Sequence, residues 1–138
     1  GEDINDQILI MDLLTWMHKN KADYTNTFCF LMNEKFSYNK KYNNEDFIIW
    51  KQRWDNRLKL NNNTQEKYLK LMHATNPLVI PRNHKVEEAL HAANNSDLTS
   101  LKKLISILEK PYEAKFIDNS YYLPSMNPGQ EYQTFCGT

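Results

Sequence analysis

Glycine is scarce in this sequence of 138 residues, which contains only three. Gly1, Gly129 and Gly137 belong to no glycine-rich phosphate-binding pattern such as GxGxxG or GxxxxGKS. Such loops need glycine where the backbone closely approaches the phosphate groups of a nucleotide. The sequence therefore predicts that this chain has no phosphate-binding loop and binds no nucleotide cofactor by itself.

Cysteine is also rare, with residues only at Cys29 and Cys136. The two form no CxxC motif, and they are too few to build a disulfide scaffold. Cysteine usage of this kind is typical of proteins from a reducing compartment. Cys29 lies among the apolar residues of an expected helix, and we interpret it as an inert buried thiol.

The sequence has neither an excess of one charge nor a long hydrophobic run. It contains 17 basic and 17 acidic residues, so its formal net charge is zero. The longest apolar run, residues 8–14, is interrupted by Asp12. It is far shorter than the roughly 20 residues of a transmembrane helix. We therefore expect neither nucleic acid nor a membrane as a partner.

Apolar residues recur at helical spacing in six segments of the chain. The expected helices comprise residues 4–20, 23–33, 45–60, 64–73, 81–93 and 98–110. No strand-like alternation accompanies them. The sequence predicts an all-α fold of about six helices in a compact bundle, the last two of which form an antiparallel hairpin.

The pattern changes after residue 110. Pro124, Pro128 and Gly129 interrupt any helical period there. Six aromatic residues in the same stretch indicate that it packs against other parts of the protein: Tyr112, Phe116, Tyr121, Tyr122, Tyr132 and Phe135. We therefore expect a helical domain over residues 1–110, followed over residues 111–138 by an extended, irregular C-terminal tail that wraps over the helices.

The first expected helix has an unusually wide apolar surface. Ile10, Leu13, Leu14 and Met17 recur at i, i+3, i+4 and i+7, and three further large side chains widen that stripe: Ile8, Met11 and Trp16. A surface of this width indicates burial against several neighbours.

Four residues with metal-binding side chains share one side of the fifth expected helix: His84, Glu87, Glu88 and His91. Imidazole and carboxylate groups at this spacing can meet at a metal ion. However, no HExxH motif is present, and no second segment supplies an obvious further ligand. A solvated polar face is the favoured interpretation, and we predict no metal site.

Arg82 and Asn83 lie at the start of the same helix, after Pro81. Free backbone N–H groups and the positive end of the helix dipole can bind an anion there. Alternatively, both side chains connect the preceding segment to a neighbouring helix, because backbone groups at helix ends must be paired in any case. We favour this structural contact and keep the anion contact as the alternative.

Three stretches of the sequence resemble the selenoprotein O family. They are residues 23–28; residues 76–90, which contain Asn76-Pro77 and Arg82-Asn83-His84; and residues 132–138, which contain Cys136. The first two fall within expected helices and their connection, and the third lies in the expected tail. They occur in order, and together they span most of the chain from the first to the last.

The resemblance implies a kinase-like fold that transfers AMP from ATP to Ser, Thr or Tyr of client proteins. This chain is similar to the distal, C-terminal part of such a protein, so the N-terminal kinase-like lobes become its expected partner. ATP and Mg²⁺ are expected for those lobes, and no catalytic residue is expected here. A bacterial, cytoplasmic protein is implied. The alternative is a free-standing helical interaction module.

Cys136 is the one site residue that the resemblance carries over. It stands third from the end of the sequence, where some family members have selenocysteine and others cysteine. We expect a redox thiol that forms a disulfide with a cysteine of the missing lobes, because Cys29 is expected inside a helix. An incidental cysteine remains the alternative.

Overall fold

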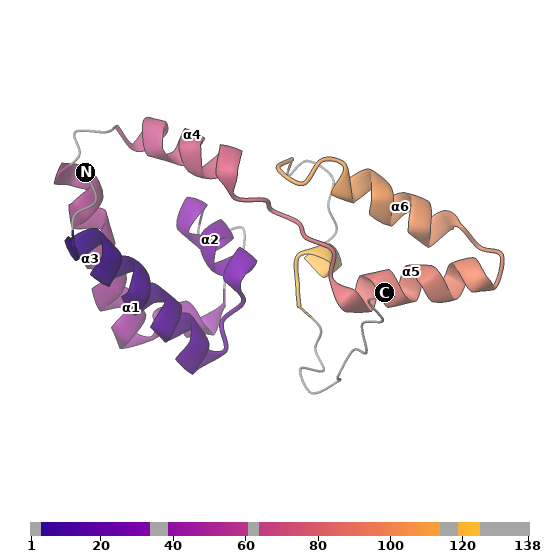
Figure 1. Cartoon of the computed structure of the whole chain (residues 1–138), viewed down its shortest axis with the longest axis horizontal. Coiled ribbons are helices and arrows are strands. Elements are labelled where there is room, and N and C mark those ends of the chain that lie inside the picture. Colours follow the sequence, from indigo (N-terminus) through magenta and orange to yellow (C-terminus); the bar gives the residue numbers. More distant parts are fainter. Residues whose placement is uncertain (1–3, 34–38, 61–63, 114–118, 125–138) are drawn as a thin grey trace. The chain divides into compact units, whose positions relative to one another are not determined.

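A computed structural model describes residues 4–33, 39–60, 64–113 and 119–124 of the chain (Figure 1). These residues form helices and loops without a strand, which confirms the all-α prediction. The six α-helices are α1 (Ile4–Asn20), α2 (Tyr24–Met32), α3 (Glu45–Leu60), α4 (Gln65–Thr75), α5 (Asn83–Asn94) and α6 (Thr99–Leu108). Two short 3₁₀ helices are η1 (Lys40–Asn43) and η2 (Asn119–Tyr121).

The chain divides into two compact units, residues 1–77 and residues 78–138. Among the described residues, none of the helices combines the length and apolar character needed to cross a membrane. The expected division into a helical domain and a tail after residue 110 stays a prediction. Much of that tail, including Cys136, lies outside the described residues.

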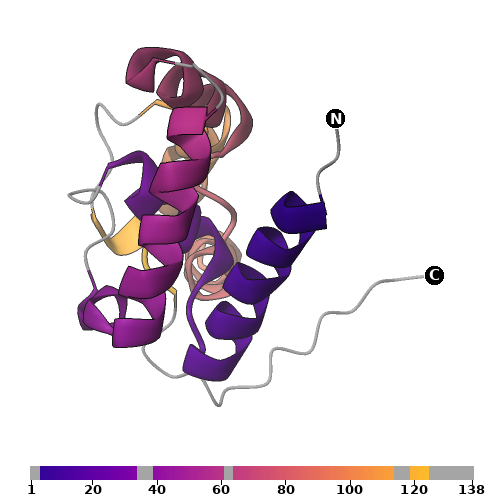
Figure 2. The same cartoon turned by 90° about the vertical axis from the view of Figure 1, so that its left-hand side faces the viewer.

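An aromatic cluster forms the core of the first unit, with Phe47 of α3 at its centre and only 1% exposed. The ring centroid of Phe47 lies 4.5 Å from that of Trp16 in α1 and 5.1 Å from that of Tyr42 in η1. Phe30 of α2 stacks on Tyr42 at 4.1 Å. In both views of the chain, α1 runs beside α3 (Figures 1 and 2). The cluster therefore joins α1, α2 and α3 through one set of ring contacts.

Local hydrogen bonds cap the start of α2. The carboxylate of Asp23, the N-cap residue, accepts a bond from the backbone N–H of Asn26 at 2.9 Å, as expected for a cap. The hydroxyl of Thr27, which is fully buried, donates to the carbonyl oxygen of Asp23 at 2.7 Å. The Cys29 thiol is buried as predicted, and it lies 3.7 Å from the carbonyl oxygen of Pro77.

In the second unit, α5 and α6 pack against each other as the predicted hairpin. Ala89 and Leu104 form its buried centre together with Tyr121 of η2. The ammonium groups of Lys85 and Lys103 lie 5.1 and 5.4 Å from the Tyr121 ring centroid, which is within the range of cation–π attraction. Tyr121 is thus a residue of the expected tail that packs on the helices.

Helix α5 begins later than the sequence predicts. Pro81 was expected in its first turn, but the helix starts at Asn83 and Arg82 occupies the N-cap position with extended backbone. The first turn therefore begins two residues beyond the proline, and the prediction for Pro81 is wrong. Thr64 occupies the expected N-cap position of α4, although its side chain makes no capping hydrogen bond.

Candidate functional site

The four helices of the first unit surround an apolar groove of about 370 Å³. Each helix contributes to its walls. The lining residues are Leu9, Ile10, Leu13, Leu14, Tyr24, Phe28, Leu31, Trp50, Trp54, Leu58, Tyr68, Leu71, Met72 and Asn76. Apart from Asn76 and two tyrosines, the lining residues are apolar or tryptophan, so the groove is suited to apolar side chains.

Two tryptophans of α3 form one wall of the groove. Trp50 and Trp54 stack with their ring centroids 6.0 Å apart and an angle of 11° between the rings. The indole N–H of Trp50 donates to the carbonyl oxygen of Leu9 in α1 at 2.8 Å. Tyr68 of α4 meets Trp54 edge-on, at 6.1 Å between centroids. The buried N–H group of Trp50 is thus paired, and the rings of this wall contact each other.

Helix α1 forms the opposite rim of the groove with Ile10 and Leu14. Both were expected in the buried stripe of this helix, but they are 58% and 38% exposed. Leu9, Leu13 and Trp16 take the side that faces the core. The prediction for Ile10 and Leu14 is wrong because a helix that is apolar on several sides does not indicate which side faces the core.

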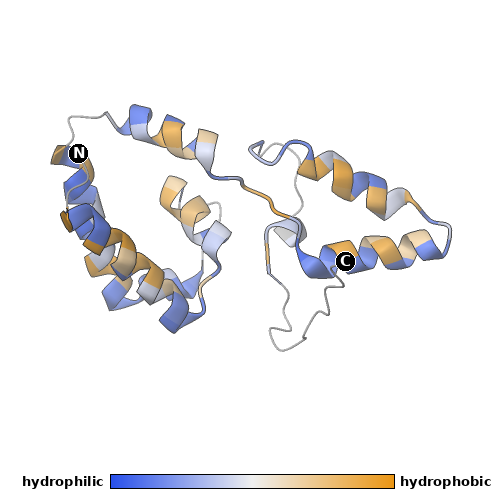
Figure 3. Cartoon of the chain, viewed as in Figure 1, coloured by the Kyte–Doolittle hydropathy of each residue, from blue (hydrophilic) through white to orange (hydrophobic). Residues whose placement is uncertain are grey.

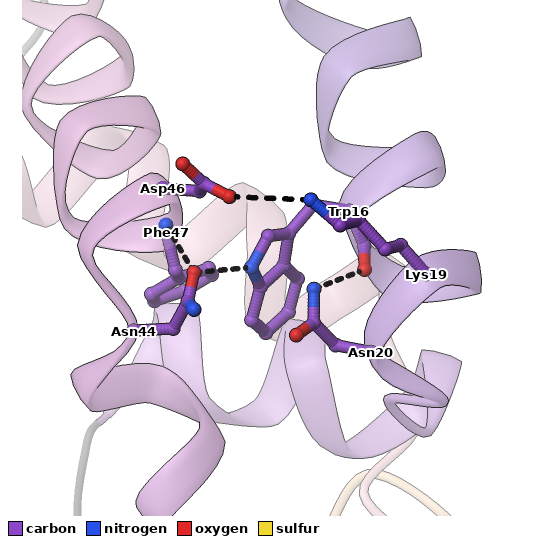
Figure 4. Close-up of polar contacts among 6 residues, drawn as sticks. All are labelled: Trp16, Lys19, Asn20, Asn44, Asp46 and Phe47. Carbon is purple, nitrogen blue, oxygen red and sulfur yellow. Dashed lines mark hydrogen bonds and ion pairs between the residues drawn. The ribbon is translucent and has the colours of Figure 1, made fainter.

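Polar contacts fix the angle between α1 and α3 (Figure 4). The indole N–H of Trp16 donates to the side-chain oxygen of Asn44 at 3.1 Å, and that oxygen also accepts the backbone N–H of Phe47 at 3.3 Å. In the same view, the Lys19 ammonium lies 3.7 Å from the Asp46 carboxylate. The side-chain oxygen of Asn44 thus accepts hydrogen bonds from both α1 and α3, and these bonds connect the two helices at one end of the rim.

Two arginines of α3 pair with carboxylates of α1 farther along the rim. Arg57 makes two bonds to Asp6, at 2.6 and 2.8 Å, and Arg53 contacts Asp12 at 2.6 Å. The guanidinium of Arg57 holds the pKa of the Asp6 carboxyl below its ordinary value of 3.8. These pairs are partly exposed, so they orient α1 more than they stabilise it.

Arg82, one of the predicted site residues, is buried in the second unit. One of its guanidinium nitrogens donates to the carbonyl oxygen of Tyr122 at 3.0 Å. This bond connects the start of α5 to the segment after η2, as a structural contact does. Asn83 is exposed as the first residue of α5. The anion contact at this helix end stays a prediction.

Three of the four candidate metal-binding residues of α5 are exposed, and the fourth, His84, is half-buried. Glu87 and His91 are exposed, and the Glu88 carboxylate lies 3.0 Å from the Lys85 ammonium. Within the described part of the chain, no group of three His, Cys, Asp or Glu side chains is arranged to hold a metal. That this helix holds no metal stays a prediction.

The groove itself was not predicted from the sequence. Its signal is present in residues 4–20, where apolar side chains occur on more sides of α1 than one core contact needs. The walls, however, come from four helices that are separated along the chain, and their meeting depends on tertiary packing. Periodicity within one helix therefore indicates surplus apolar surface without locating a groove.

Comparison with known proteins matches residues 2–109 to the family model described as protein adenylyltransferase SelO. The protein nucleotidyltransferase YdiU of Pelagibacter ubique is 52% identical over 138 residues, which cover 100% of this chain and 29% of that relative. The proteins of the same name from Alcanivorax borkumensis and Nitrosococcus oceani are 45% and 43% identical, and the aligned residues again cover 100% of this chain. They cover 29% and 28% of those relatives, so the chain spans less than a third of their length.

Proposed function

This chain belongs to the SelO protein adenylyltransferase family, and from that premise we propose that it is the non-catalytic helical part of a longer enzyme. The longer enzyme transfers AMP from ATP to Ser, Thr or Tyr residues of client proteins. The single observation that carries the proposal is the family match over residues 2–109. The names of the relatives, which are protein nucleotidyltransferases of bacteria, support the same reaction class.

Kinase-like lobes in the rest of the longer protein are proposed to bind ATP and Mg²⁺. In this chain, the scarcity of glycine argues against a phosphate-binding loop. The groove of the first unit has mainly apolar walls, which suit packing better than phosphate binding. The chain therefore contributes structure to the enzyme, while the reacting groups lie elsewhere.

The alternative of a free-standing interaction module is less well supported. A module that is stable alone covers its large apolar side chains, because exposed apolar patches promote association. Here Ile4, Met11 and Ile10 are 66%, 59% and 58% exposed on α1. This surface favours a chain that belongs to a larger protein.

Cys136 has a redox role in our proposal, as a thiol that forms a disulfide with a cysteine in the rest of the enzyme. Its support is the resemblance to the selenocysteine position of the family. Cys29 is an unsuitable partner because it is only 2% exposed within the first unit. The reaction joins two thiols and releases two protons and two electrons to an oxidant such as hydrogen peroxide.

Labelled ATP tests the proposed reaction. The protein expressed from the complete gene should incorporate label from the α-phosphate of ATP into protein when Mg²⁺ is present. The 138-residue chain alone should incorporate none. Label from the γ-phosphate is the control, because its transfer would identify a kinase instead. AMP transfer by the 138-residue chain alone, or its absence from the full-length protein with all clients present, would overturn the proposal.

A further inference from the structure

The side of α1 that faces away from the core carries five large apolar residues, which we call the outer face of α1. It comprises Ile4, Ile8, Ile10, Met11 and Leu14, with exposed fractions of 66%, 47%, 58%, 59% and 38%. Colouring by hydropathy shows apolar residues along α1 (Figure 3). A helix with large apolar side chains on several sides is typical of the interior of a protein, yet the described residues of the first unit cover this one on one side only.

Among these apolar residues, the exposed side of α1 also carries the polar side chains of Gln7, Thr15 and His18. The charged residues of α1 are Asp6, Asp12 and Lys19. Each of them forms an ion pair with an oppositely charged residue of α3. The charged residues of α1 thus take part in the contact between α1 and α3. The large exposed apolar side chains of the outer face therefore suit an occupant that is itself mainly apolar.

The outer face is continuous with the groove of the first unit. Ile10 and Leu14 belong to both, since they form the α1 rim of the groove. An apolar segment that lies along α1 can therefore insert side chains between α1 and the tryptophans of α3. An apolar groove beside exposed apolar residues is typical of surfaces that bind an apolar helix face.

Resting on the proposed function, we propose that the outer face of α1 and the adjoining groove are the docking surface for another segment of the same longer protein. Most of the length of each relative lies outside the aligned region, so ample chain is available to cover the surface. Contact within one polypeptide also does not depend on protein concentration, because the linked segment stays close to the surface. The occupant is an uncharged, apolar segment, and α1 becomes an interior helix.

Methionine oxidation in the unmodified full-length protein tests this docking. Met11 lies on the outer face and is 59% exposed, whereas Met17 on the same helix is 5% exposed in the core. With hydrogen peroxide as oxidant and mass spectrometry as readout, Met11 should be oxidised about as slowly as Met17. Both should react equally fast after denaturation. If Met11 reacts roughly tenfold or more faster than Met17 in the native protein, the outer face is open and the proposal is wrong.

Dilution separates a segment of the same chain from a second copy. Protection of Met11 should not change with protein concentration, because the contact is intramolecular. Protection that disappears on dilution would show that a second copy covers the face, and would overturn the proposal. AMP transfer is measured on the same sample. Transfer with an unprotected Met11 contradicts only the docking, whereas protection without transfer contradicts only the proposed reaction.

A matched pair of charged variants of the full-length protein gives a second test. Met11→Glu should lower the melting temperature by several degrees, because it buries a charge under the docked segment. Gln52→Glu, at an exposed polar position of α3, should leave it nearly unchanged. Equal melting temperatures for the two variants would overturn the proposal.

Discussion

Tyr42 places an ionisable hydroxyl inside the aromatic core of the first unit. The residue is 6% exposed, and its hydroxyl oxygen lies 3.3 Å from that of Thr27. Because the Thr27 hydroxyl donates to Asp23, Tyr42 is the donor between the two hydroxyls. Burial raises the pKa of Tyr42 above its ordinary value of 10.0. The neutral phenol is therefore part of the folded core.

This raised pKa predicts a loss of stability in alkali. Below pH 10 the phenol is neutral in both states, and its contribution to the free energy of unfolding is fully present. As the pH rises above 10 and through the folded-state pKa, the unfolded chain ionises first and the contribution is lost. Tyr42→Phe should cost about 1 kcal/mol at neutral pH and make the alkaline decline shallower.

Denaturant unfolding between about pH 8 and pH 11 measures this effect. Tyr24→Phe is the matched control, since Tyr24 is 61% exposed on α2 and should follow the parent chain at each pH. An alkaline decline equally steep in Tyr42→Phe and in the parent chain would contradict the assignment to Tyr42.

Among the elements, α1 and α3 depend on each other through ion pairs that respond to pH. The pKa of Asp6 is held below 3.8 by Arg57. The stabilisation from this pair is present above pH 3.8 and is lost as the pH falls through the folded-state pKa. Because the pair is partly exposed, salt should weaken it.

Asp6→Asn should reduce the loss of stability below about pH 4, and the remaining acid dependence should come from other carboxylates. Arg57→Gln should remove the same part of the pH dependence, because each variant breaks the same pair. The double variant should then resemble either single one, as in a double-mutant cycle. Independent, additive changes in the acid dependence would contradict coupling between α1 and α3 at this site.

The sequence predicts some elements better than others, and the reasons are physical. The helices expected at residues 4–20 and 45–60 have those bounds, because long apolar periods and flanking polar residues define them. The start of α5 was missed because Arg82 takes extended backbone after Pro81. Leu90 of α5 and Ile105 of α6 are about half exposed, whereas Tyr121 packs in the core between these helices, a contact that helical periodicity does not encode.

On the scale of the whole molecule, the all-α class could be predicted from periodicity, whereas the candidate site could not. The groove joins residues as far apart as Leu9 and Asn76, and no local pattern encodes that meeting. The family could be predicted because it rests on specific motifs at residues 76–90 and 132–138. The proposed role of Cys136 also depends on the whole molecule, because its proposed partner is a cysteine in the rest of the longer protein.

Oxidation of the full-length protein tests the role of Cys136. Under hydrogen peroxide, non-reducing mass spectrometry should detect a disulfide between Cys136 and a cysteine outside this chain. Reductant should then change AMP transfer in the parent protein but not in Cys136→Ser. If no bond forms through Cys136, and both proteins respond equally to reductant, Cys136 is an incidental cysteine.

The two units differ in their tryptophan content, so their fluorescence can be told apart. The sequence contains three tryptophans, and Trp16, Trp50 and Trp54 all belong to α1 and α3 of the first unit. Residues 78–138 contribute tyrosine but no tryptophan. Fluorescence excited selectively at the indole therefore reports only on the first unit, while far-ultraviolet circular dichroism reports on helices of both. The chain thus carries a built-in optical label for one half of its fold.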